Sequence, residues 1–210
     1  MTAKDCGHED DERKKLYRRL STAAAFFFLL VLFLILLIWL ILQPSKPRFV
    51  LQDATVFAFN LSAANTLTTT VQVTLAARNS NQRIGIYYDR VDVYASYHGQ
   101  QITLPTLLPP TYQGHKDSAV WSPFLYGDAV PVAPELGVAF NQDQIAGTLM
   151  VHIRVRGRVR WKVGTFVSGG YHLYVNCPAF INSGGRNVGI GDGGEAAAKY
   201  QLIVKCHVDV

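Results

Sequence analysis

The hydrophobic and polar positions divide the chain into one long apolar run and a following region in which the two kinds of residue alternate. Residues 21–42 contain no charged side chain. A helix of this length, with a rise of about 1.5 Å per residue, would be roughly 33 Å long and would match the roughly 30 Å hydrocarbon core of a bilayer. The pattern therefore predicts one transmembrane helix over residues 21–42, with the lipid bilayer as a partner.

The charges beside this run predict its orientation. Six Lys and Arg residues precede it, whereas Lys46 and Arg48 follow it closely. The flank richer in Lys and Arg normally stays in the cytoplasm. A cleaved signal peptide is the main alternative, but its apolar region is usually about 7 to 15 residues long and ends at small residues. We therefore predict, in chain order, a cytoplasmic basic tail, an uncleaved anchor, a linker and an extracellular domain, over residues 1–20, 21–42, 43–48 and 49–210.

The extracellular region alternates apolar and polar residues with the period of two that is typical of half-buried strands. Such runs cover residues 49–61, 66–79, 90–97, 147–167, 171–177 and 200–210. Six or seven strands separated by Gly and Asn predict a mainly β protein, with an antiparallel sandwich after the anchor.

Three segments of this region depart from the strand pattern. Residues 134–145 begin with Pro and have helical apolar spacing, so we expect one short helix there. Residues 168–170 are Ser-Gly-Gly between two strand runs, which predicts a hairpin turn. Residues 182–198 are rich in Gly and Ala, and we expect a loop.

The positive charge of the predicted extracellular region is concentrated in one strand. The whole chain has a formal net charge of +5, and from residue 43 onward 14 Lys and Arg residues face 10 Asp and Glu residues. Five of those 14 occupy every second position of one run: Arg154, Arg156, Arg158, Arg160 and Lys162. We call these five residues the basic row. Because the charge is so local and the compartment is extracellular, we expect no nucleic-acid partner.

Alternation places the basic row on one face of its strand and apolar residues on the other, with Gly157 as a gap or bulge among the apolar residues. One interpretation is simply a solvated outer face, with protection of a sheet edge from further pairing as an optional additional role. The other is a binding surface for an extended anionic partner, because like charges in a row favour a ligand of opposite charge. De-esterified pectin and the headgroups of the outer leaflet are the candidate ligands.

The three cysteines differ in their predicted compartment. Cys177 and Cys206 each end a strand run in the oxidising compartment, so we predict a disulfide between them. If the two strands pair antiparallel, their register must bring the cysteines opposite each other. Cys6 would be cytoplasmic, where it is either a reduced thiol or a palmitoylation site.

Other chemical signals are weak. Residues 189–194 match GxGxxG, but they lie in a loop of a β domain, without the strand-helix-strand unit that a dinucleotide site needs. The histidines lack metal-ligand spacing, and neither a catalytic carboxylate pair nor a nucleophile motif is present. We therefore predict no enzyme activity, catalytic residue, metal or cofactor. Asn60-Leu61-Ser62 is a glycosylation acceptor on the predicted outer side.

Three ordered motifs resemble a known plant family. They are AlaArgAsnSerAsnGlnArgIleGlyIleTyrTyrAsp at 77–89, TyrGlnGlyHisLys at 112–116, and GlyArgValArgTrpLysValGlyThrPhe at 157–166 followed by residues 171–177. The chain resembles the plant harpin-induced and non-race-specific-disease-resistance-like family, within the group-2 late-embryogenesis-abundant superfamily. It departs from that family at Ser80, where an Asn-Pro-Asn motif usually has Pro. Since two turn-forming Asn residues remain, the expected fold is unchanged.

The resemblance implies a single-pass plasma-membrane protein with a fibronectin-III-like sandwich outside the cell and no catalytic residues. It also implies a role in defence or stress responses, through contacts with the wall or with other surface proteins. The alternative from the same superfamily is a dehydration-stress protein that protects membranes or proteins without a dedicated partner. Anchoring favours the first hypothesis, because a general protectant gains little from attachment to one surface.

Overall fold

A computed structural model describes residues 6–41, 44–62, 65–182, 198–200 and 203–210. The chain divides into two compact units, Met1–Gln43 and Pro44–Val210. The first unit contains one helix, α1 (Cys6–Ile41), of 36 residues. Its segment Lys14–Leu37 is long and apolar enough to cross a membrane. The helix begins well before the predicted anchor, because the basic tail after Gly7 is rich in the helix formers Glu, Lys, Arg and Leu.

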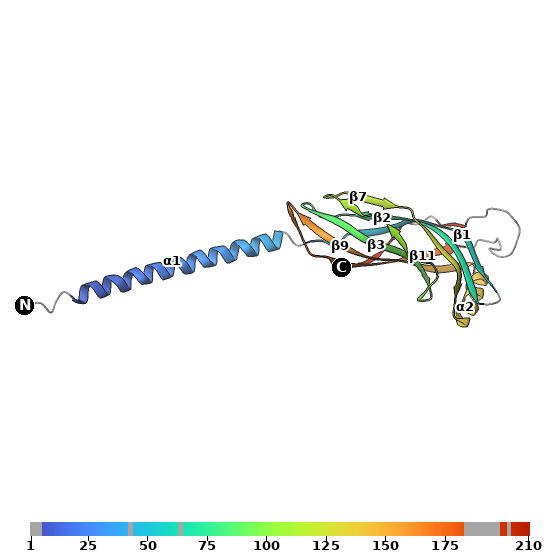
Figure 1. The fold of residues 1–210 in the computed structure, drawn as a ribbon, viewed down its shortest axis with the longest axis horizontal. Coiled ribbons are helices and arrows are strands. Elements are labelled where there is room, and N and C mark those ends of the chain that lie inside the picture. The colour runs from blue at the N-terminus through green and yellow to red at the C-terminus, as the bar shows by residue number, and fades with distance from the viewer. Residues whose placement is uncertain (1–5, 42–43, 63–64, 183–197, 201–202) are drawn as a thin grey trace, which may run out of the picture. The chain divides into compact units, whose positions relative to one another are not determined.

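The second unit is a mainly β, sandwich-like domain of two antiparallel sheets, shown in Figure 1. Sheet A has the strand order β12-β1-β2-β7, with β13 also paired to β1 and β8 to β2. Its strands are β1 (Arg48–Leu61), β2 (Thr66–Arg78), β7 (Ser118–Trp121), β8 (Phe124–Pro131), β12 (Ala198–Tyr200) and β13 (Val204–Lys205).

Sheet B has the strand order β14-β11-β9-β3-β4, with β10 also paired to β9 and both β5 and β6 to β3. Its strands are β3 (Ile84–Tyr97), β4 (Gln100–Gln101), β5 (Thr106–Leu108), β6 (Thr111–Gln113), β9 (Thr148–Val163), β10 (Phe166–Val167), β11 (Tyr171–Asn182) and β14 (His207–Asp209). Strands β3, β9 and β11 therefore form the middle of this sheet.

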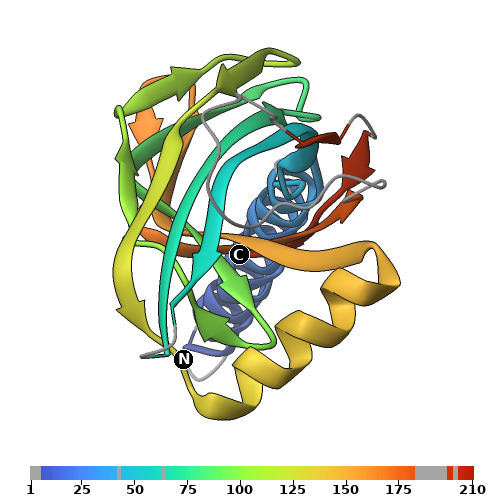
Figure 2. The same ribbon diagram turned by 90° about the vertical axis from the view of Figure 1, so that its right-hand side faces the viewer.

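The core lies between the two sheets and follows the alternation read from the sequence. In β9, Ile153, Val155 and Val159 are almost completely buried, while the intervening residues face outward. The predicted short helix is α2 (Pro134–Ala146). Its Phe140 stacks on Phe59 of sheet A, with ring centroids 4.8 Å apart. Its Asp143 accepts a hydrogen bond from the Tyr97 hydroxyl of sheet B at 2.7 Å. The helix, yellow in Figure 2, thus contacts both sheets.

Two buried asparagines fix the turn between β2 and β3. The Asn79 side chain donates hydrogen bonds to the carbonyl oxygens of Ile84 and Gly114 at 2.7 and 2.8 Å. Asn81 exchanges hydrogen bonds with the backbone of Ser45. These bonds explain why the turn is kept with Ser80 between the two asparagines: the amide side chains hold it, without the preset φ of a proline.

Several sequence predictions need correction. The predicted 90–97 strand begins at Ile84, and five short strands between Gln100 and Pro131 were not predicted, because prolines interrupt their alternation. The hairpin turn predicted at 168–170 is wrong. The β9–β10 pairing places the turn at Gly164-Thr165, and 168–170 only separates two strands paired to the same edge of β9. The predicted 200–210 strand is divided into short pieces, and residues 183–197, including the GxGxxG match, lie outside the described residues.

Candidate functional site

The basic row lies on the outer face of β9, in the middle of sheet B. Strand β9 pairs with β3 along one side and with β11 along the other. The row therefore does not protect a sheet edge, and this part of the sequence interpretation is wrong. Its five cations instead lie between two rows of neighbouring side chains, which decide how much of their charge is available.

A bulge in β3 brings both acidic and basic side chains to this face. Between Tyr88 and Arg90 the pairing with β9 shifts by one residue, so that Asp89 and Arg90 both turn outward. Gly157 of β9 stands opposite this bulge. A Cβ atom at Gly157 would lie 2.6 Å from the Arg90 carbonyl oxygen, which only glycine avoids. The position of Gly157 is therefore filled by the backbone of β3 and is not a gap, and the bulge is in the partner strand.

Asp89 neutralises one member of the basic row. The Arg160 guanidinium donates two hydrogen bonds to the Asp89 carboxylate, both at 2.6 Å. These hydrogen bonds raise the pKa of Arg160. Such a two-point pair fixes the planar guanidinium in one orientation. Arg160 is therefore the row member whose charge is most fully satisfied within the protein.

Tyrosine rings accompany two of the remaining cations, Arg156 and Lys162. The Arg156 guanidinium lies over the Tyr94 ring at 5.3 Å from its centroid. Lys162 Nζ lies 5.7 Å from the centroid of Tyr87 and 5.2 Å from that of Tyr112. Arg154, half-buried, stands between Tyr94 and Asn176 in the strand register. Its Nε is enclosed and has no hydrogen-bond partner among the described residues.

Arg158 differs from the other row members, because its neighbours on both sides are basic. In register it stands between Arg90 of β3 and His172 of β11. All three residues are exposed, and Arg158 forms no ion pair within the part of the chain that the structure describes. Around it lies an open depression of about 590 Å³, whose walls also include Arg156 and Tyr174. We call this depression the sheet B groove.

The sequence could not reveal which residues complete this groove. Alternation in 90–97 does place Arg90, Asp92 and Tyr94 on one face. Their position beside the basic row, however, depends on the β3–β9 register, which joins segments about 65 residues apart. No local pattern marks His172 as part of the groove, because its nearness to Arg158 depends on the β9–β11 pairing.

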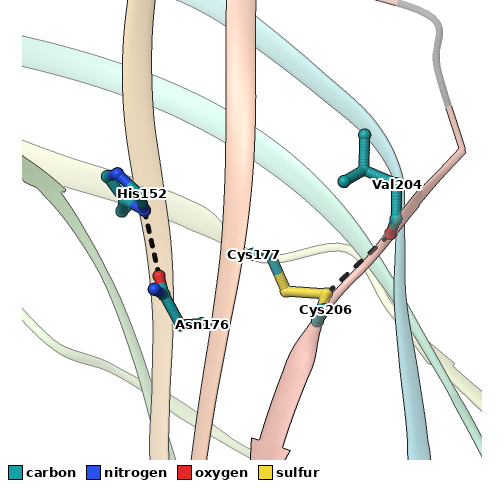
Figure 3. Close-up of a disulfide and its surroundings, with 5 residues drawn as sticks. All are labelled: His152, Asn176, Cys177, Val204 and Cys206. Atoms are coloured by element: carbon teal, nitrogen blue, oxygen red, sulfur yellow. Dashed lines mark hydrogen bonds between the residues drawn. A yellow bond between two sulfur atoms is a disulfide. The ribbon is translucent and has the colours of Figure 1, made fainter.

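The predicted disulfide is present. Cys177 and Cys206 are bonded, with their Cα atoms 4.3 Å apart. Strand β11 pairs with β14 so that Asn176 stands opposite His207, and the same register brings the cysteines face to face. Figure 3 shows the bond beside the Val204 carbonyl, and nearby the contact between His152 of β9 and Asn176 of β11. The geometric condition set by the sequence is therefore met.

The other candidate residues are separate from the groove. Asn60 is exposed in β1, on sheet A, and its glycosylation stays a prediction. Cys6 is the first residue of α1, and the structure describes its backbone only. Its palmitoylation also stays a prediction. Among the described residues, no group of three or more His, Cys, Asp or Glu side chains could hold a metal ion.

Comparison with known proteins identifies the family. The family described as "Late embryogenesis abundant protein" matches residues 58–178. NDR1/HIN1-like protein 12 of Arabidopsis thaliana is 55% identical over 211 residues, covering 100% of both chains. The chain belongs to the NDR1/HIN1-like family of late embryogenesis abundant proteins. NDR1/HIN1-like proteins 1 and 26 of the same plant are 58% and 42% identical, covering 83% and 70% of this chain and 84% and 70% of their own.

This membership confirms the resemblance read from the three motifs. It places the protein in a plant family related to stress and defence, and that family is not known for enzymatic activity. The matched residues 58–178 include β9 and the β3 bulge, so the sheet B groove lies within the family domain.

Proposed function

We propose that this NDR1/HIN1-like protein is a plasma-membrane-anchored component of plant defence or stress responses, not an enzyme, with its sandwich domain outside the cell. In this proposal α1 anchors the chain with its basic end in the cytoplasm. The domain acts as an interaction module, and Asn60 is available for glycosylation. Support comes from the apolar segment Lys14–Leu37, the surplus of cations before it and the disulfide, which suits an oxidising compartment.

The observation that carries the binding proposal is the outer face of sheet B. The basic row extends over nine residues of one strand, and its eight steps of about 3.3 Å give a length of roughly 26 Å. Its cations lie beside tyrosine rings, of which Tyr112 and Tyr174 are about half exposed. A linear face with both cations and aromatic rings suits an extended polysaccharide with carboxylate groups, since carboxylates pair with guanidinium groups and sugar rings pack on aromatic faces. De-esterified pectin is such a polymer.

The experiment compares the full chain with two double variants, each in uncharged detergent, on immobilised polygalacturonate. Arg156→Gln/Arg158→Gln removes two cations of the groove. Arg48→Gln/Arg78→Gln removes two exposed cations that are register partners on the adjacent strands β1 and β2 of sheet A. Both double variants therefore change the net charge by the same amount. An exposed ion contact contributes up to about 1 kcal/mol, or roughly fivefold in affinity. We expect the groove variant to bind about tenfold more weakly and the sheet A variant to bind like the wild type.

Salt supplies a second test of the same proposal. Exposed charges are screened over about 8 Å at physiological ionic strength, so binding should weaken steeply as salt rises.

Two outcomes of the binding experiment would contradict the proposal. Equal loss in both double variants would mean that only net charge matters, and the basic row would then be a solvated strand face. Binding to vesicles with anionic headgroups, but not to polygalacturonate, would assign the face to the membrane instead.

A further inference from the structure

Three basic side chains on adjacent strands of sheet B form a second line, which runs perpendicular to the strands. We call it the transverse row. The register places Arg90 of β3 beside Arg158 of β9, and Arg158 beside His172 of β11. Directly opposed like charges destabilise a sheet. The Arg90 and Arg158 guanidinium groups, joined by the His172 imidazole once it carries a proton, are therefore an unfavourable arrangement for the isolated fold, and an anion placed between them would relieve it.

The charges that surround this transverse row leave it positive. Three guanidinium groups line the groove, those of Arg90, Arg156 and Arg158, together with two carboxylates, and a fourth guanidinium group, that of Arg160, is paired with one of these carboxylates. Asp89 is held by Arg160, while Asp92 approaches the Arg90 guanidinium at 3.5 Å. The net charge is therefore +2 when His172 is neutral and +3 when it carries a proton.

We propose that Arg90, Arg158 and His172 form a proton-linked site for a carboxylate or sulfate group, in which protonation of His172 strengthens anion binding. The site rests on the proposed function and deepens it, because a carboxylated polymer lying along β9 would cross this row. Lower pH should favour the complex, because the added charge appears where the anion binds.

The groups that face His172 from each neighbouring element are consistent with this linkage. On β9, Arg158 stands beside it and Arg156 and Arg160 lie diagonally. On β11 the His172 and Tyr174 rings stack with centroids 6.3 Å apart. On β14, Asp209 stands opposite Tyr174 and His207 stands opposite Asn176, with His207 Nε2 3.2 Å from the Asp209 carboxylate. A hydrogen bond from Lys46 lowers the pKa of Asp209, so its charge stays constant above pH 5.

The first measurement is binding of the full chain in uncharged detergent to polygalacturonate at pH 7.5 and pH 5.5, where the polymer's carboxylates stay ionised. We expect about two- to fivefold tighter binding at pH 5.5, the gain of one exposed ion contact. His172→Gln should lose this gain and bind like the wild type at pH 7.5. His115→Gln, which removes an exposed histidine outside the groove, should keep the gain. An unchanged pH response in His172→Gln would overturn the site.

A second measurement separates this site from the proposed function. Anion binding that is linked to a proton must raise the titration midpoint of His172, since linkage is reciprocal. NMR would follow the titration of His172. We expect its midpoint to be higher in sodium sulfate than in sodium chloride at equal ionic strength, and we expect Arg158→Gln to reduce this difference. A shifted midpoint without polymer binding would support the site and reject the polymer as partner. Polymer binding without any shift would keep the proposed function and reject the site.

Discussion

Gly157 is the residue on which the shape of the groove most depends. It has no side chain at the point where the backbone of the β3 bulge approaches β9. That bulge turns both Asp89 and Arg90 outward. One carboxylate then holds Arg160 while the neighbouring guanidinium lies beside Arg158. The distribution of charge on this face therefore follows from a backbone requirement at one position.

Replacing Gly157 by Ala should destabilise the domain. The new Cβ would lie 2.6 Å from the Arg90 carbonyl oxygen and 2.9 Å from Val91 Cγ2, so the strands would have to separate. Overpacking of this kind typically costs about 1 to 3 kcal/mol. Urea unfolding of the full chain in detergent would measure the loss. Gly169→Ala is the matched control, because no atom lies within 4 Å of its added Cβ, and an equal effect of the two substitutions would contradict this explanation.

Individual residues also show where sequence reasoning succeeds and where it stops. Alternation alone placed Ile153 and Val155 in the core and Arg156 and Arg158 on the outer face, and the structure confirms this. It could not show that Arg160 is neutralised while Arg158 is not. That difference comes from a bulge in a strand about 70 residues earlier, whose register no local pattern encodes.

At the scale of elements, long alternating strands were predictable and short ones were not. Strands β1 and β2 match their predicted ranges closely: β2 keeps its period over its whole length, and β1 keeps enough alternation to be recognised although two bulges interrupt it. Strands β4–β7 contain only two to four residues each, too few for a period to be recognised. The position of β9 in the middle of sheet B was also hidden, because a row of cations resembles the usual protection of an edge strand.

The disulfide joins the last strand to the middle of the domain. Cys177 is in β11 and Cys206 directly precedes β14, 29 positions later. Closing a loop of this length should stabilise the domain by about 3 to 4 kcal/mol in the chain-entropy model. We expect Cys177→Ala/Cys206→Ala to lower the free energy of unfolding by that order, with a reducing agent having a similar effect on the wild type. Thiol labelling of both cysteines in the native, unreduced protein would contradict the bond.

At the scale of the whole molecule, the two units have different chemistry and different roles in the proposal. The N-terminal unit is one helix whose central segment is apolar, and the C-terminal unit is a sandwich with a buried core and a charged outer face on sheet B. Charge beside the anchor predicts which side of the membrane each unit occupies. A wall polymer can reach the sheet B groove only if the sandwich lies outside the cell, so this topology is the central claim.

Protease accessibility of tags at the two ends of the chain, in intact protoplasts, tests that claim most directly. We expect a tag before Met1 to be protected and a tag after Val210 to be removed, with both removed once the membrane is permeabilised. The reverse result, a protected C-terminal tag and a cleaved N-terminal one, would place the sandwich in the cytoplasm and contradict an extracellular binding role.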